Sequence, residues 1–193
     1  LTVLHRNSGQ MESFNQLNSQ LVNENVYAIL PDKEGSILLG TLSALVSFNP
    51  EKRSFTTIDK EKDGTPFTSQ RITILFRDSR KRLWIGGEEG ISVFQQEGIE
   101  IEKAPILPES SVTKMFTNCI YEAANGIIWV GTREGFYCFN EKEKKIKRYT
   151  TANGLPNNVV YGILEDTFGR LWVSTNRGIS CFNPETEKFR NFT

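Results

Sequence analysis

The sequence predicts an all-β protein built from repeated four-stranded antiparallel sheets, and three observations support this fold class. A segment of the type Leu-Trp-Ile-Gly recurs about every 45 residues, at 37–40, 83–86, 128–131 and 171–174. A Phe stands ten residues after the second position of each segment, at Phe48, Phe94, Phe139 and Phe182. Apolar runs too short for confident helices precede the segments.

Each repeat is expected to begin with a short apolar strand followed by a turn. The strand is rich in β-branched and aromatic residues on both of its faces, so both faces need cover from neighbouring sheets. These strands are predicted at 26–30, 72–76, 119–121 and 160–164. The turn carries Asp32, Asp78 or Asp166, with Ala123 in the third repeat. Because the Asp recurs at one repeat position, it predicts a structural turn rather than a calcium or catalytic site.

The remaining three strands of each repeat follow in order. The Trp segment forms the second strand, and Gly90, Gly135 or Gly178 suits the loop to the third. Third strands are expected at 91–94, 136–139 and 179–182, each before a type I turn that starts with Asn where the chain has one. Fourth strands alternate apolar and polar residues, at 54–58, 146–149 and 189–192.

Four antiparallel strands per repeat of this length indicate the blades of a β-propeller, because one sheet cannot cover both of its own faces. We expect blades at 23–66, 67–111, 112–154 and 155–193, in one propeller domain. Residues 1–22 are expected to supply the last two strands of a preceding blade, at 2–6 and 11–17. The chain is thus predicted to be a propeller fragment, from a parent of seven blades by analogy. The alternative is a compact ring closed by four blades, with 1–22 along its outside.

The repeat motifs resemble a known family. The fourth repeat carries Asp166 and Gly169, the run Leu-Trp-Val-Ser-Thr at 171–175, Gly178-Ile179 and Phe182-Asn183. It is similar to the two-component regulator propeller repeat and departs from it at Ser174, where the family usually has Gly. The resemblance covers about 23–193. It implies the periplasmic sensor region of a Bacteroides-type hybrid two-component histidine kinase, responsive to carbohydrates.

Composition and charge exclude several partners. Lys plus Arg and Asp plus Glu number 23 each, so no net field attracts nucleic acid. No apolar stretch is long enough for a membrane helix, and no signal peptide begins the sequence. Cys119, Cys138 and Cys181 are too scattered for a disulfide framework and are expected to be small apolar packing residues. The partners that we expect are the missing blades of the parent, or other copies that associate through open blade faces.

The sequence offers no catalytic constellation, no metal site and no cofactor motif. His5 is the single histidine, which excludes a histidine-based triad or multi-histidine centre within this chain. The tryptophans are expected to pack between blades rather than to stack on sugars. The basic run 80–82 is expected to be solvated. A propeller lyase is therefore the least favoured alternative.

A ligand site, if present, is expected on the loops between second and third strands. Propeller ligands bind at one end of the ring, where neighbouring blades present variable side chains. Paired arginines on adjacent blades would suit a carboxylate or sulfate on an acidic oligosaccharide. The candidate residues are Glu88, Glu89, Arg133, Glu134, Asn176 and Arg177. The same surface without a small ligand would serve as a protein-interaction scaffold.

Overall fold

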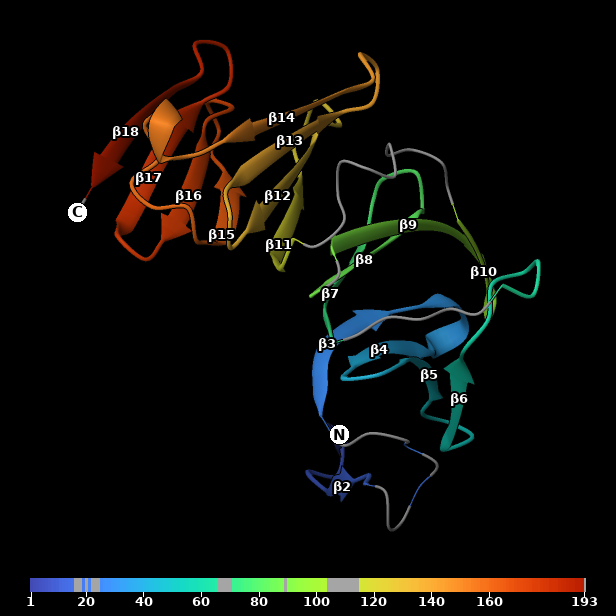
Figure 1. Ribbon diagram of the computed structural model, residues 1–193. Helices are drawn as coiled ribbons and strands as arrows, with labels where there is room; N and C mark the ends of the chain where they lie inside the picture. Colours follow the sequence, from blue (N-terminus) through green and yellow to red (C-terminus); the bar gives the residue numbers. More distant parts are fainter. Residues whose placement is uncertain are drawn as a thin grey trace.

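The computed structural model describes residues 1–15, 19, 21, 25–65, 71–88, 90–103 and 115–192. These residues form four four-stranded antiparallel sheets and one two-stranded sheet (Figure 1). In each larger sheet the strands lie side by side in chain order. The all-β propeller fragment predicted from the repeats is confirmed.

The strand bounds follow the repeat. The two-stranded sheet pairs β1 (Thr2–Leu4) with β2 (Met11–Ser13). The first four-stranded sheet contains β3 (Val26–Pro31), β4 (Ile37–Thr41), β5 (Leu45–Asn49) and β6 (Ser54–Ile58). The second contains β7 (Ile72–Arg77), β8 (Leu83–Gly87), β9 (Gly90–Glu97) and β10 (Glu100–Lys103). The third contains β11 (Thr117–Glu122), β12 (Ile128–Thr132), β13 (Phe136–Asn140) and β14 (Lys145–Tyr149). The fourth contains β15 (Val160–Glu165), β16 (Leu171–Thr175), β17 (Gly178–Asn183) and β18 (Lys188–Phe192).

The N-terminal strands are shorter than expected. β1 ends at Leu4 rather than at residue 6, and β2 ends at Ser13. The last two residues of the expected strand 11–17 lie outside the described residues. Phe14, just beyond β2, packs edge-on against Phe48 and Phe55 at centroid distances of 5.1 and 5.5 Å. This contact fixes the short hairpin against the first four-stranded sheet.

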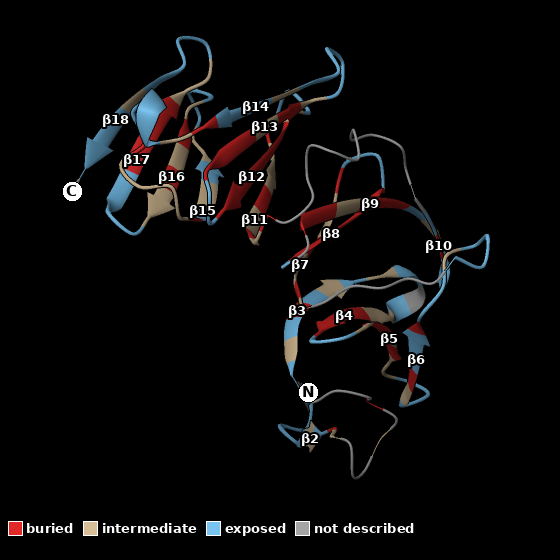
Figure 2. Cartoon of the chain, in the orientation of Figure 1, coloured by how far each residue is buried: buried red, intermediate tan, exposed pale blue. Residues whose placement is uncertain are grey.

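Burial is heaviest on the second strands, not on the first as the sequence indicated. Every residue of β8 and β12 is buried, whereas β7 and β11 alternate buried and half-buried positions (Figure 2). Ile29 in β3 and Leu164 in β15 are 58% and 65% exposed. The expectation was wrong because cover on both sides depends on a neighbouring sheet, and β3 and β15 belong to the outermost four-stranded sheets.

Consecutive sheets pack through the Trp and Phe of the repeat. Trp84 meets Phe139 of the next sheet edge-on at 6.2 Å, and Trp129 meets Phe182 of the sheet after that at 5.5 Å. Both tryptophans are buried, which confirms their packing role. Trp172 in the fourth sheet is half-buried and stacks on Phe192 of its own sheet at 5.6 Å. The second and third sheets therefore each pack their Trp against the sheet that follows.

The glycine of the second strand is required by close approach of the next sheet. A Cβ placed on Gly131 would lie 2.5 Å from both Cys119 Sγ and Val160 Cγ1. Ser174 occupies the same position in the fourth sheet. Its side chain is accommodated because Gly162, its cross-strand partner, stands where the third sheet has Cys119. The departure from the family pattern at Ser174 is thus matched by a second small residue.

The sheets form an open row rather than a closed ring. The hairpin β1–β2 and the sheet β15–β18 lie at opposite ends of the molecule (Figure 1). The alternative of a compact four-blade ring is therefore wrong. One face of the fourth sheet carries Leu164, Trp172, Ile179 and Phe192 on adjacent strands. The exposed fractions of Leu164, Ile179 and Phe192 are 65, 49 and 41%. We call this surface the C-terminal face.

Candidate functional site

The loops between second and third strands have one construction in three of the sheets. A Thr at the end of the second strand donates its hydroxyl to the carbonyl three residues later, as Thr132 Oγ1 does to Gly135 at 3.0 Å. The same hydroxyl accepts the backbone N–H of Glu134 at 3.0 Å. Thr41 and Thr175 make the equivalent pairs of bonds, the first accepting from Ser43 and the second from Arg177. We call this pair of bonds the threonine clamp and the two residues that it encloses the tip of the loop. Each clamp holds its tip in a fixed position at the end of the sheet.

The tips carry the candidate site residues. Glu88 forms an ion pair with Arg71 of its own repeat, at 2.9 Å. Arg133 lies over the ring of Phe116 at 3.7 Å from the centroid. Glu134 faces Arg148 at 3.9 Å. These contacts bind each tip to its own repeat.

The structure places the tips at the same end of successive sheets but does not join them. None of the contacts described above links one candidate residue with another. Asn176 and Arg177 are exposed, and among the described residues the guanidinium of Arg177 has no partner. Glu89 lies outside the described residues. The expected ligand residues therefore form a row of separate tips rather than an enclosed pocket.

Arg71 supports the tip of its repeat. Its backbone N–H donates to the carbonyl of Leu42, in the loop between β4 and β5 of the preceding repeat, at 2.7 Å. Its guanidinium lies 5.3 Å from the ring centroid of Tyr27. A hydrogen bond and charge interaction with Tyr27, together with Glu88, raise the pKa of Arg71 above its usual value. Arg71 thus remains a cation between two neighbouring sheets.

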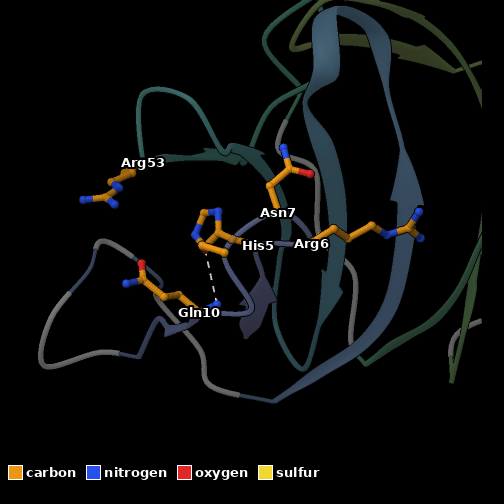
Figure 3. Close-up of a pocket in the computed structure, with 6 residues that line it drawn as sticks. His5, Arg6, Asn7, Gln10 and Arg53 are labelled. Carbon is orange, nitrogen blue, oxygen red and sulfur yellow. Dashed lines mark hydrogen bonds between the residues drawn. The ribbon is translucent and has the colours of Figure 1, made fainter.

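A hollow of about 390 Å³ lies by the N-terminal hairpin, away from these loops (Figure 3). It is lined by His5, Arg6 and Arg53, among others. Glu12 pairs with His5 at 3.5 Å and with Arg53 at 3.3 Å. The side chain of His5 is 48% exposed, so this histidine lies at the surface.

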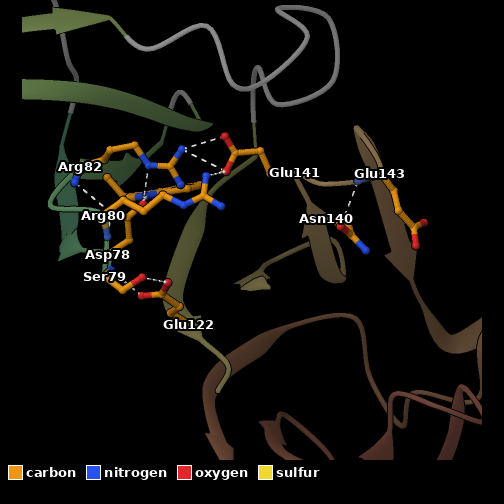
Figure 4. Close-up of polar contacts among 9 residues, drawn as sticks. Asp78, Ser79, Arg80, Arg82, Glu122, Asn140, Glu141 and Glu143 are labelled. Carbon is orange, nitrogen blue, oxygen red and sulfur yellow. Dashed lines mark hydrogen bonds and ion pairs between the residues drawn. The ribbon is translucent and has the colours of Figure 1, made fainter. Parts of the chain in front are cut away.

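A polar network that sequence reasoning missed lies at the opposite end of the sheets (Figure 4). One Asp78 carboxylate oxygen accepts the backbone N–H groups of Arg80 and Arg82, at 3.0 and 2.9 Å. The other accepts Arg82 Nε at 2.6 Å and Trp84 Nε1 at 2.9 Å. Arg82 then reaches Glu141 of the next sheet at 3.0 and 3.1 Å. The turn role of Asp78 is confirmed, but the run 80–82 is not simply solvated, because Arg82 is buried.

The cysteines are packing residues. All three are free, with Cys181 buried and the other two half-buried. Burial raises the pKa of Cys119 to about 12 and that of Cys138 to about 11. Both are therefore neutral thiols at physiological pH, which agrees with a role as small apolar side chains.

Among the described residues, no cluster of three or more His, Cys, Asp or Glu side chains is suited to a metal ion. The same residues include no helix with the length and apolar character needed to cross a membrane.

Comparison with known proteins agrees with this architecture. The family described as two component regulator propeller matches residues 66–89, 110–134 and 154–177. Histidine kinase P4 of Formosa agariphila is 29% identical over 161 residues, which cover 79% of this chain and 12% of the kinase. The chain therefore spans about one eighth of that relative's length.

Two solved structures show the same fold. The extracellular domain of the putative one component system BT4673 from B. thetaiotaomicron matches 94% of this chain and 28% of its own, with a TM-score of 0.73 and 20% identity. Virginiamycin B lyase from Staphylococcus aureus matches 87% of this chain and 55% of its own, with a TM-score of 0.58 and 18% identity. The two component regulator propeller model thus matches three segments of the chain, and these solved structures share its propeller fold.

Proposed function

We propose that the chain is a ligand-sensing segment of the extracytoplasmic propeller of a two-component sensor. The observation that carries the proposal is the family match on three successive repeats, supported by a relative that is a histidine kinase. The proposal assigns binding and signal transduction to this segment, not catalysis. It places the segment in the periplasm, as the ectodomain of an inner-membrane sensor.

The proposed ligand is an acidic oligosaccharide held at the loop tips. Arg133 lies one residue after Thr132, and Arg177 lies two residues after Thr175, at the tips of loops on neighbouring sheets. Two guanidinium groups on neighbouring loop tips can each donate two parallel hydrogen bonds to a carboxylate or sulfate. The Phe116 ring beneath Arg133 restricts its movement, which lowers the entropy lost on binding.

A thermal-shift screen tests this function. The chain is heated with a panel of sulfated, uronate-containing and neutral oligosaccharides, and its unfolding midpoint is measured. A ligand bound only by the folded state at a hundred times its Kd adds about 2.7 kcal/mol to stability, so we expect a clear rise with one of the acidic sugars. The double variant Arg133→Gln, Arg177→Gln should lose this rise.

A matched control distinguishes binding at the loop tips from non-specific attraction to positive charge. Lys142→Gln, Lys144→Gln removes two exposed positive charges from the turn at the other end of the third sheet, and should leave the rise unchanged. Loss of the rise in both double variants would show non-specific attraction and contradict the site. No rise with any sugar would refute the oligosaccharide sensor and favour the protein-interaction scaffold.

A further inference from the structure

The sheets of this chain are joined at their turns by charged groups. We call the contact between two successive four-stranded sheets a joint and number the joints in chain order. In the second joint, between the sheets β7–β10 and β11–β14, Ser79 donates its backbone N–H and its hydroxyl to Glu122 at 2.7 and 2.6 Å. In the third joint, the backbone N–H of Ala124 donates to Glu165 at 2.8 Å. Glu122 and Glu165 both end the first strand of their sheet. In these two joints the following sheet sends a carboxylate back to the turn of the sheet before it. In the first joint the same position holds Arg77, whose guanidinium donates to Asp32 of the sheet before it at 2.9 Å.

The second joint has an additional pair, between Arg82 and Glu141. Glu141 directly follows Asn140, at the turn between third and fourth strands of the following sheet. The Asp78 carboxylate orients the guanidinium of Arg82 from within its own sheet. With Glu141 in place, the side chain of Arg82 is only 8% exposed.

The fourth sheet repeats the Asp, Arg and Trp side of this joint. Asp166 accepts the backbone N–H of Arg170 at 3.0 Å, Arg170 Nε at 2.8 Å and Trp172 Nε1 at 2.9 Å. Partial desolvation opposes the charged carboxylate, but hydrogen bonds from Trp172, Phe168 and Arg170 outweigh it and lower the pKa of Asp166 to about 2. The arrangement of Asp78, Arg82 and Trp84 is thus present a second time.

The carboxylates that would complete this joint, the counterparts of Glu122 and Glu141, are not among the described residues. The side chain of Arg170 is 41% exposed, against 8% for Arg82. Thr167 stands where Ser79 stands, one residue after the Asp, and is exposed with both its N–H and its hydroxyl available. Two donor sites for carboxylates therefore border the C-terminal face.

We propose that the C-terminal face docks a further four-stranded sheet of the same repeat, which supplies two carboxylates. One ends its first strand and binds Thr167, as Glu122 binds Ser79. The other follows the Asn of its turn between third and fourth strands and binds Arg170, as Glu141 binds Arg82. An aromatic side chain at the position of Phe139 covers Trp172.

Ser174 adds a restriction on size. At the equivalent Gly131, an added Cβ would lie 2.5 Å from Val160, which begins the first strand of the next sheet. Since Ser174 already has this carbon, the docking sheet has a residue smaller than Val at the start of its first strand.

A second copy of this chain does not meet these requirements. Pro31 ends the first strand of its first four-stranded sheet, where Glu122 and Glu165 stand in later sheets. In the same sheet Pro50 follows Asn49 at the turn between third and fourth strands, where the third sheet has Glu141 after Asn140. Neither carboxylate is available, so the docking partner is a different sheet of the repeat. The inference rests on the proposed role of the chain as one segment of a larger sensor propeller.

An extended chain tests the proposal. A second copy of residues 150–192 is joined after Thr193, with Val160 of the added copy replaced by Ala. One version has Pro184 of the added copy, which aligns with Glu141, replaced by Glu, and the matched control keeps Pro184. We expect the Glu version to unfold about 2–4 °C higher than the control, as an interaction of about 1 kcal/mol gives in a chain of this size. Arg170→Gln in the original sheet should remove this difference.

Exchanging the two charges of the proposed ion pair shows whether a lost difference reflects the pair itself or a misfolded variant. Arg170→Glu, combined with Arg at the Pro184 position of the added copy, should restore the higher midpoint. Equal midpoints for the Glu and Pro versions, or a difference that survives Arg170→Gln, would overturn the proposal. Dimerisation of the unextended chain that Arg170→Glu abolishes would also overturn it, in favour of a second copy. The oligosaccharide screen is a separate readout, so failure of either idea is visible by itself.

Discussion

Asp78→Ala is expected to lower the free energy of unfolding by about 3–5 kcal/mol, the usual cost of leaving one partner of a buried ion pair uncompensated. The Asp78 side chain is fully buried and Arg82 is 8% exposed. The substitution leaves the Arg82 guanidinium with Glu141 alone and leaves the indole N–H of Trp84 unpaired. Urea unfolding followed by circular dichroism measures the loss.

Asp166→Ala is the matched control for this prediction. It removes the same set of hydrogen bonds from a carboxylate that is 19% exposed and an arginine that is 41% exposed. Water can then solvate the groups left behind, so the loss should be clearly smaller than that of Asp78→Ala. Equal losses would mean that the next sheet does not seal the network around Asp78.

Trp129→Ala should destabilise the chain by about 3–5 kcal/mol, as truncation of a large buried aromatic side chain does. Trp129 is 2% exposed and stacks on Phe136 at 4.9 Å in addition to meeting Phe182 in the next sheet. Ala123 replaces the turn Asp in this repeat, so the substitution tests packing without the Asp–Trp hydrogen bond. The loss is measured by urea unfolding, as for Asp78.

Trp172→Ala provides the comparison within the same chain. Trp172 stacks on Phe192 but has no aromatic side chain from a following sheet among the described residues. Its truncation should therefore cost less than that of Trp129, although it also loses the bond to Asp166. If Trp172→Ala were the more damaging change, packing between sheets would not be the main source of stability.

Local patterns were sufficient to predict the second strands and the turns that begin with Asn or Asp. The Trp segments coincide with second strands, and the Asn residues cap the turns that they were expected to start, as Asn183 does by accepting the N–H groups of Glu185 and Thr186. Such features depend on residues only a few positions apart, so they can be read from one repeat. The exposed loop tips were predicted on the same basis.

The contacts between sheets could not be predicted in this way. Arg82 and Glu141 are 59 residues apart in the chain, and a basic run looks solvated until the neighbouring sheet is placed against it. The compensation between Ser174 and Gly162 depends on the cross-strand register. Burial of the first strands was misjudged for the same reason, because it depends on whether a second sheet is present.

Accessibility of the three tryptophans to acrylamide tests most directly whether each sheet is covered by the one that follows it. Three variants, each with two tryptophans changed to Phe, report on Trp84, Trp129 and Trp172 separately. Fluorescence quenching should be weak for Trp84 and Trp129, which are 1% and 2% exposed, and several-fold stronger for Trp172 on the C-terminal face. Equal quenching of Trp129 and Trp172 would contradict the face-to-face packing of successive sheets.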